Sequence, residues 1–168
     1  MDENEKFGNA EEVELIAESL IPNYHPELAT ARIKYLFVEK APKKGGRELP
    51  GKASKVSGKW EHLTELDFTI EVPAPTWDEA SNEQRQALVD HLLEYCTAEE
   101  DEKTGDFKWL IREPDVREFS SILQRHSCWN DTLTDFVTVA QGIDVSGIVD
   151  EEMNDVLSEE EVDLTVEE

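Results

Sequence analysis

The chain has 168 residues, of which 40 are Asp or Glu and 16 are Lys or Arg, so its formal net charge is -24. With 38% hydrophobic residues it can bury one modest core, which excludes a large multidomain enzyme. No apolar run reaches the roughly 18 to 20 residues of a membrane span, and the acidic start is unlike the basic start of a secretory signal. We therefore expect a soluble protein that acts in the cytoplasm.

The charge is distributed unevenly along the chain. Residues 32–59 hold nine Lys or Arg against two Glu, whereas residues 131–168 hold thirteen acids and no Lys or Arg. A strongly acidic surface repels phosphates and attracts basic proteins, which disfavours direct nucleic-acid binding except through the basic segment. The cations of the loop expected over residues 40–59 are Lys40, Lys43, Lys44, Arg47, Lys52, Lys55 and Lys59.

Hydrophobic spacing predicts the elements of the first third of the chain. Apolar residues at helical spacing over 13–21 predict a helix that ends near Pro22, followed by a short helical turn at Pro26. The apolar, β-branched and aromatic residues of 33–38 predict a buried strand. The Gly, Pro, Ser and Lys content of 40–59 predicts an exposed, mobile connection.

The middle of the chain returns to strands and then to a helix. Residues 60–63 and 66–72 have strand character, so together with the first strand they predict a small antiparallel or mixed sheet. Ser81 and Gln84 have the spacing of a capping box, which begins a helix that runs to Tyr95 and packs on the sheet.

Less regular patterns follow. The acidic residues 99–102 indicate a break, and residues 107–111 form either an edge strand or an extended lead into the next helix. Pro114 suits the first position of a helix, and a last helix is expected over 133–139. These elements predict an α+β fold.

We expect two regions in the chain. Residues 1–141 form the α+β domain, and residues 142–168 form an acidic tail that is disordered or docks on a partner. The two cysteines are too few for a disulfide framework, which indicates a reducing compartment.

The order of these elements and several of their sequences resemble the putative phage metallopeptidase family. The resemblance implies a minimal zincin-like domain, in which a metal-binding helix packs on a small sheet, and a phage or prophage origin with action in the bacterial cytoplasm. The matching stretches are Glu18-Ser19-Leu20-Ile21, Ala31-Arg32-Ile33-x-Tyr35-Leu36-Phe37, Gly51-Lys52-Ala53-x-Lys55, Asp67-Phe68-Thr69-Ile70, Trp77, Gln84-Arg85-Gln86-Ala87-Leu88-Val89-Asp90-His91 and Asp115-Val116-x-Glu118-Phe119.

The catalytic residues that the resemblance implies are mostly missing. A zincin helix carries H-E-x-x-H, because two His one turn apart bind Zn²⁺ and the adjacent Glu accepts a proton from the metal-bound water. Here the window reads His91-Leu92-Leu93-Glu94-Tyr95, and Pro114 stands where the family's third ligand is expected. Losing the general base alone removes a factor of about 10² to 10⁴ in rate. We therefore predict an inactive relative without a metal or other cofactor, in which His91 is a hydrogen-bonded core histidine.

A rebuilt zinc site is the alternative that keeps the protein an enzyme. His91, His126, Cys96 and Cys128 are the right residue types for tetrahedral zinc, but their spacings are not recurrent zinc geometries. Glu94 points away from the direction that a general base requires, because it stands two residues beyond position 92 on a helix that turns about 100° per residue. This reading predicts a zinc metallopeptidase with a rearranged metal site.

The loss of catalytic groups together with the large charge predicts an interaction protein. Its carboxylates could replace DNA phosphates and so inhibit a basic host nucleic-acid-binding or defence protein. The alternatives are that the acids only solubilise the protein, and that the loop lysines pair with the acidic body rather than bind phosphate. The predicted partner-binding residues are Glu99, Glu100, Asp101, Glu102, Asp150, Glu151, Glu152, Asp155, Glu159, Glu160 and Glu161.

Overall fold

The computed structural model describes residues 6–100, 102–103 and 107–143, which divide into two compact units. The first unit ends at Pro114 and the second begins at Asp115, within the region that the sequence predicts to be one domain, 1–141. The predicted acidic tail lies outside the described residues, apart from Gly142 and Ile143.

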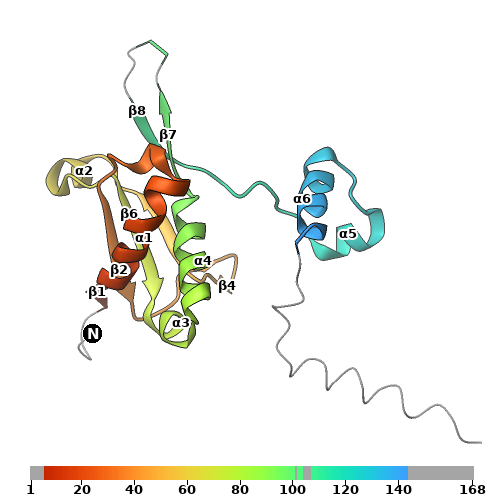
Figure 1. Ribbon diagram of the computed structural model, residues 1–168, viewed down its shortest axis with the longest axis horizontal. Helices are drawn as coiled ribbons and strands as arrows, with labels where there is room; N and C mark the ends of the chain where they lie inside the picture. The colour runs from red at the N-terminus through yellow and green to blue at the C-terminus, as the bar shows by residue number, and fades with distance from the viewer. Residues whose placement is uncertain (1–5, 101, 104–106, 144–168) are drawn as a thin grey trace, which may run out of the picture. The chain divides into compact units, whose positions relative to one another are not determined.

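A four-stranded mixed sheet is the centre of the first unit (Figure 1). Its order is β1 (Phe7–Asn9), β2 (Ile33–Val38), β6 (Phe68–Pro73) and β5 (Lys52–Lys55). β2 and β6 run parallel, with Tyr35 beside Ile70, whereas β1 and β5 are antiparallel to their neighbours. The mixed sheet with packed helices confirms the predicted α+β class, and β1 is a strand that the sequence pattern did not reveal.

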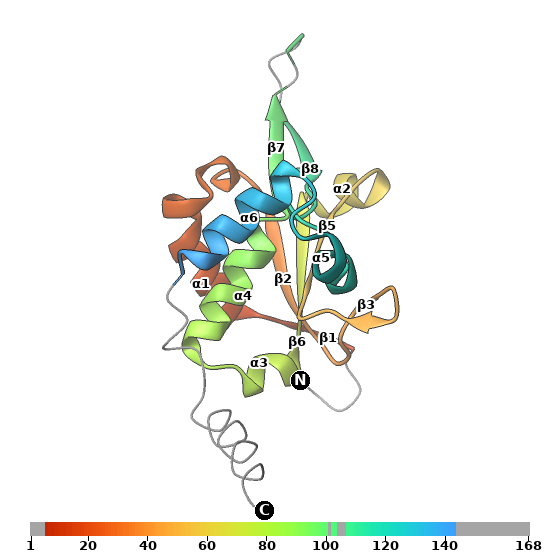
Figure 2. The same cartoon turned by 90° about the vertical axis from the view of Figure 1, so that its right-hand side faces the viewer.

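Three helices cover one face of this sheet. They are α1 (Glu11–Tyr24), α3 (Ala74–Glu79) and α4 (Asn82–Leu93), and we call them the helical layer. Figure 2 shows the sheet edge-on, with α1 and α4 on one side. The core lies between the layers, because Val13 and Ala17 of α1 and Val89 and Leu93 of α4 are buried against the inward side chains of β2 and β6, such as Ile70.

The first helix differs from its predicted end. α1 continues through Pro22 to Tyr24, so the prediction that the helix ends near Pro22 is short by two residues. Proline lacks an N–H, but in the last turn it removes only one helical hydrogen bond, and the N–H of His25 still donates to the Ile21 carbonyl at 3.0 Å. The predicted turn at Pro26 is the 3₁₀ helix η1 (Pro26–Leu28).

The predicted mobile connection is largely structured. A short hairpin joins β3 (Lys43–Lys44) to β4 (Arg47–Glu48) through two glycines with positive φ, and β5 then pairs with β6. The prediction of an exposed loop over 40–59 is therefore wrong for Lys52–Lys55. Lysine and serine are poor strand signals, yet they are common on edge strands, where they prevent further pairing.

The expected strand at 60–63 is a helix. α2 (Lys59–Thr64) starts after Gly58, whose φ is +61°, and ends at Glu65, whose φ is +57°. The Thr64 hydroxyl donates to the Trp60 carbonyl at 2.7 Å. Trp60 is exposed, so the aromatic residue that suggested a strand does not pack in a sheet.

The capping box at the start of α4 is confirmed. Ser81 accepts a hydrogen bond from the Gln84 backbone, and the Gln84 side chain accepts one from the Ser81 backbone. The helix ends at Leu93, two residues before the predicted Tyr95, because the chain turns into strand β7 (Cys96–Glu100). β7 pairs with β8 (Phe107–Ile111), which confirms the edge-strand interpretation of residues 107–111.

The described part of the second unit contains helices α5 (Ser120–His126) and α6 (Asp131–Gln141). α6 confirms the last predicted helix, but the prediction that Pro114 begins a helix is wrong. The carboxylate of Glu118 accepts hydrogen bonds from the Phe119 N–H and the Trp129 indole, so this side chain takes an amide that a helix from Pro114 would use. These two bonds lower the pKa of Glu118.

Candidate functional site

The window that corresponds to H-E-x-x-H lies at the end of α4. Leu92, where the resemblance leads us to expect the general base, is 1% exposed and lies against Gly51, the residue before β5, which has no side chain to obstruct it. A Cβ on Gly51 would stand 2.7 Å from the Leu92 Cδ1 atom. Leu92 is therefore a hydrophobic side chain that belongs to the core.

The prediction that His91 is a core histidine is wrong. His91 is exposed, and its ring meets that of Tyr95 edge-on, with 5.3 Å between the ring centroids. Tyr95 follows the end of α4 at Leu93, and this ring contact holds the two side chains together. Tyr95 fills the position of the second imidazole.

The buried histidine of this protein is His25, which the sequence did not indicate. It is 2% exposed, and its Nε2 atom lies 2.6 Å from the Asp90 carboxylate. Because His25 follows α1 and Asp90 is on α4, this contact joins the two long helices of the helical layer. Asp90 is the residue before His91. Its carboxylate bonds to His25, so it stabilises the packing of the two helices and does not orient His91.

The predicted alternative zinc ligands are in dissimilar environments. Cys96 is buried, and burial raises the pKa of its thiol to about 12, which keeps it protonated at neutral pH. His91 is exposed, whereas His126 and Cys128 belong to the second unit. Within the described ranges, three or more His, Cys, Asp or Glu side chains nowhere gather as metal ligands would. Within the first unit, the exposed His91 and the buried, protonated Cys96 therefore do not supply the ligand set that a zincin site requires.

A buried carboxylate also supports the fold. Asp67 is 5% exposed and accepts hydrogen bonds from the backbone N–H of Arg32 at 2.8 Å and from its guanidinium at 3.2 and 3.3 Å. This contact holds the start of β2 beside the start of β6. Arg32 and Asp67, like Gly51, lie in stretches that carry the family resemblance, so those stretches are explained by packing.

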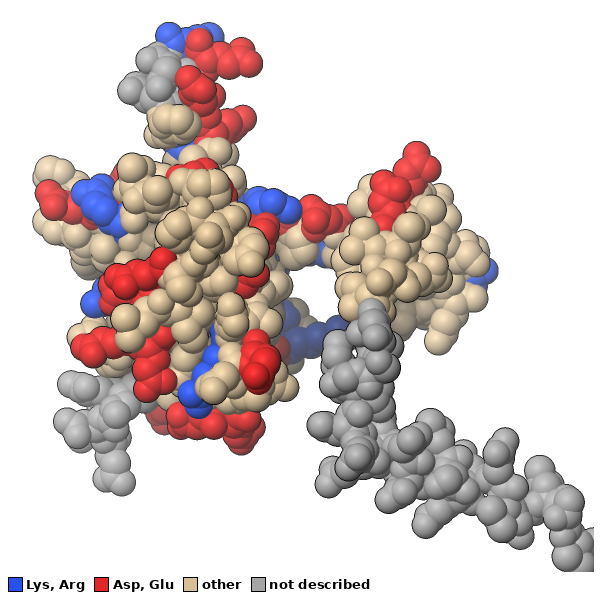
Figure 3. Space-filling view, in the orientation of Figure 1, with Lys and Arg blue, Asp and Glu red and all other residues tan. Residues whose placement is uncertain are grey.

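The helical layer is strongly acidic, and sequence reasoning did not identify it as a surface. Together with η1 it carries nine Asp or Glu and a single Arg or Lys, Arg85, which bonds to the Trp77 carbonyl and approaches Glu12. Figure 3 shows red side chains spread over this face. The signal was present in the sequence as acids opposite the apolar positions of each helix. The nine acids are Glu11, Glu12, Glu14, Glu18, Glu27, Asp78, Glu79, Glu83 and Asp90.

The predicted contact acids lie elsewhere. Glu99 and Glu100 are the last residues of strand β7 rather than part of a loop, and Glu102 is in the turn that follows. Asp101 and all the predicted tail acids lie outside the described residues.

The basic segment lies around the sheet face opposite the helical layer. In Figure 2, β3 and α2 are on the side away from α1 and α4. Lys43 pairs with Glu48 at 3.1 Å, Lys44 pairs with Glu113 at 3.6 Å, and the Lys59 ammonium lies 5.4 Å from the Trp60 ring centroid. Several of the loop cations thus have partners within the first unit.

The family of the chain follows from a comparison with family models. Residues 5–141 match the model described as putative phage metallopeptidase, and the chain belongs to this family. No curated protein matches the chain, and no solved structure matches it. In the part of the chain that the structure covers, none of the helices has the length and hydrophobicity to cross a membrane.

Proposed function

We propose that this protein is a catalytically inactive member of its family that acts in the bacterial cytoplasm as an acidic interaction protein. Its helical layer contacts the basic groove of a host nucleic-acid-binding or defence protein, and its carboxylates take the place of DNA phosphates there. The observation that carries this proposal is the concentration of nine acids against one Arg on the helices of the helical layer and η1.

The catalytic half of the proposal rests on Leu92 and Tyr95. Leu92 cannot accept a proton, and because it is packed against Gly51 it cannot be exchanged for a carboxylate without burying a charge. The alternative function, a zinc peptidase with a rearranged metal site, predicts about one zinc per chain. Elemental analysis of protein purified without chelator decides between them, and a stoichiometric zinc whose removal changes the fold would contradict the proposal.

The interaction half rests on rigidity and charge. A charged face built on packed helices holds its carboxylates in place, whereas acids on a flexible chain must be ordered on binding. Arg85 carries one positive charge against the nine acids, and its guanidinium lies 4.0 Å from the Glu12 carboxylate, so most of the acids have no cation on these helices to offset them. A basic partner that normally holds nucleic acid would find a preformed negative surface.

Displacement of host proteins from DNA tests this function. Host lysate is bound to DNA-cellulose at fixed salt, the full-length protein is added, and the released proteins are identified by mass spectrometry. We expect a small, discrete set of DNA-binding proteins to be released. Poly-L-glutamate of equal total charge is the control for general polyanion effects, and equal release by poly-L-glutamate would contradict specific mimicry.

Two variants that remove equal charge locate the surface. One is Glu11→Gln, Asp78→Asn and Glu79→Gln on the helical layer, and the other is Glu99→Gln, Glu100→Gln and Glu102→Gln on the β7–β8 hairpin. We expect the first variant to release less protein and the second to act like the parent. The reverse result would move the interface to the hairpin.

A further inference from the structure

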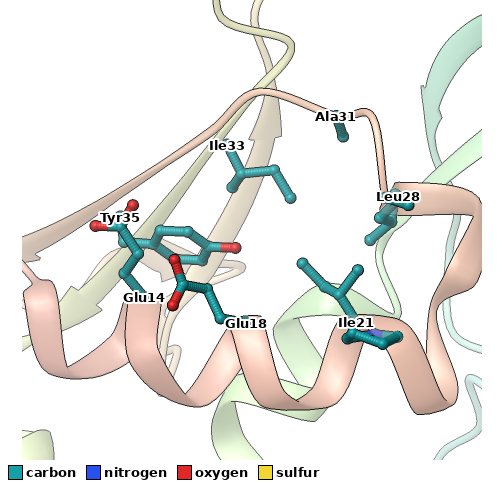
Figure 4. Close-up of a pocket in the computed structure, with 9 residues that line it drawn as sticks. Glu14, Glu18, Ile21, Leu28, Ala31, Ile33 and Tyr35 are labelled. Atoms are coloured by element: carbon teal, nitrogen blue, oxygen red, sulfur yellow. The ribbon is translucent and has the colours of Figure 1, made fainter.

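A cleft of about 390 Å³ opens on the helical layer between α1, η1 and β2 (Figure 4). Its walls and floor are apolar and include Ile21, Ala31 and Ile33. Glu14 and Glu18 stand at its edge, one helical turn apart on α1. The cleft therefore combines an apolar interior with a negative rim.

The two carboxylates at the rim are not neutralised by the protein. Glu14 and Glu18 are exposed, and within the described ranges no Lys or Arg pairs with either of them. Like charges one turn apart on a helix repel each other. A cation placed between them would relieve this repulsion.

The hydroxyl of a largely buried tyrosine also points into the cleft. Tyr35 is 6% exposed, and its hydroxyl points into the space bounded by Glu18, Ile21 and Ile33 (Figure 4). Among the described residues this hydroxyl has no hydrogen-bond partner. Burial raises the pKa of Tyr35, and the nearby Cys96, Glu14 and Glu18 raise it further, so the phenol stays neutral and can exchange hydrogen bonds with a ligand.

This combination defines the ligand chemistry. An anion would be repelled by Glu14 and Glu18, and a purely apolar group would remove water from their carboxylates without replacing its hydrogen bonds. An aliphatic stem that ends in a cation matches both the apolar interior and the negative rim of the cleft. The stem covers apolar surface while the charged head remains at the edge. Among protein side chains only arginine and lysine have this form.

We propose that the cleft between α1, η1 and β2 is an anchor site for an arginine or lysine side chain of the basic partner. The stem lies on Ile21, Ala31 and Ile33, and the cation lies between Glu14 and Glu18 within reach of the Tyr35 hydroxyl. This inference rests on the proposed function and adds to it the residue that the partner inserts. One deeply inserted basic residue would supply much of the binding energy, as arginine does at the centre of many interfaces.

Nuclear magnetic resonance titration of the full-length protein tests the cleft directly. The probe is n-butylguanidinium, and neutral n-butylurea is the control of similar shape. We expect n-butylguanidinium to shift the amide signals of Ala31 and Ile33, and n-butylurea to bind at least about fivefold more weakly because it lacks the charge. Equal binding of the two probes would overturn the proposal.

Matched variants separate the cleft from the general negative field. Glu14→Gln/Glu18→Gln removes two charges at the rim, and Asp78→Asn/Glu79→Gln removes two charges on α3. We expect the first variant to weaken n-butylguanidinium binding about fivefold or more and the second to change it less than about twofold. Ala29→Leu, at an exposed position in the lining, should also weaken binding without any change in charge. Equal effects of the two charge variants would overturn the anchor site.

An octa-arginine peptide distinguishes failure of the cleft from failure of the proposed function. If the peptide binds the parent protein and both charge variants weaken it equally, the acidic face is an interaction surface and the cleft proposal is wrong. If it fails to bind the parent at physiological salt, the acidic interaction function is wrong as well. Binding that the rim variant weakens at least about fivefold more than the α3 variant supports both proposals.

Discussion

Leu92 shows how a single residue joins the helical layer to the sheet. Position 92 belongs to the helix face that packs on β5, so a leucine there gains buried apolar area and needs no polar partner. Gly51, which precedes β5, is required on the opposite side because its backbone approaches the Leu92 side chain closely.

The Gly51–Leu92 contact can be tested by substitution. Gly51→Ala places a Cβ 2.7 Å from the Leu92 Cδ1 atom and 3.0 Å from the Glu71 carbonyl oxygen. The leucine methyl can rotate away, but the β6 backbone cannot move without disturbing the sheet, so we expect the free energy of unfolding to fall by about 1 to 3 kcal/mol. Urea denaturation measures the change.

A double-mutant cycle provides the control for this prediction. Leu92→Ala alone should cost about 2 to 5 kcal/mol through lost packing. Because it also removes the methyl group that meets the new Cβ, Gly51→Ala should cost less in the Leu92→Ala background than in the parent. Strict additivity of the two substitutions would show that the two residues are not in contact.

At the scale of elements, the start of α4 positions most of the helical layer. Its capping box satisfies backbone N–H groups that would otherwise have no partner. The Ser81 hydroxyl also donates to the Glu83 carboxylate at 2.9 Å. The backbone N–H of Glu83, and then this hydroxyl, lower the pKa of the Glu83 side chain.

Removing the cap should weaken the helix in a pH-dependent way. We expect Ser81→Ala to lower the free energy of unfolding by about 0.5 to 2 kcal/mol at pH 7, and Asn82→Ala, at the next residue, to have a smaller effect. A carboxyl group with a lowered pKa stabilises the fold above its unfolded pKa and loses this effect as the pH falls through its folded pKa. The difference between Ser81→Ala and the parent should therefore shrink in acid, and thermal melts from pH 7 to pH 3 measure it. A difference that grows in acid would contradict the assignment.

At the scale of the whole molecule, a net charge of -24 opposes folding through self-repulsion. The ion pairs of the described residues mostly join exposed side chains, such as Lys43 and Glu48, and such pairs contribute little. Salt screens repulsion over a distance of about 30 Å at 0.01 M and about 3 Å at 1 M. The stability of this protein should therefore depend on ionic strength.

We expect the melting temperature to rise between 10 mM and 500 mM NaCl by several degrees, because screened repulsion outweighs the loss of weak surface pairs. Calorimetry measures the rise. Matched titrations with sucrose, which stabilises through exclusion and leaves charges unscreened, separate screening from general solvent effects. A melting temperature that falls with salt would mean that attractive pairs dominate the surface.

The local patterns of the sequence determined a substantial part of this structure. Apolar periodicity identified α1, β2, β6 and α6, and the Ser81 and Gln84 spacing identified the start of α4. The residues at 91 to 95 predicted the loss of the zincin ligands, because ligand identity is written directly in the sequence. These features depend on neighbouring residues or on residue type alone.

Tertiary structure alone decided the features that depend on distant contacts. Lys52–Lys55 is a strand because β6 offers it an edge, and the stretch at 60–63 is a helix because no strand pairs with it. The sequence placed His91 in the core, but the fold buries His25 instead, because Asp90 meets it across two helices. The acidic face and its cleft appear only when α1, η1 and β2 are brought together, since charge and shape at a surface are sums over residues that are far apart in the chain.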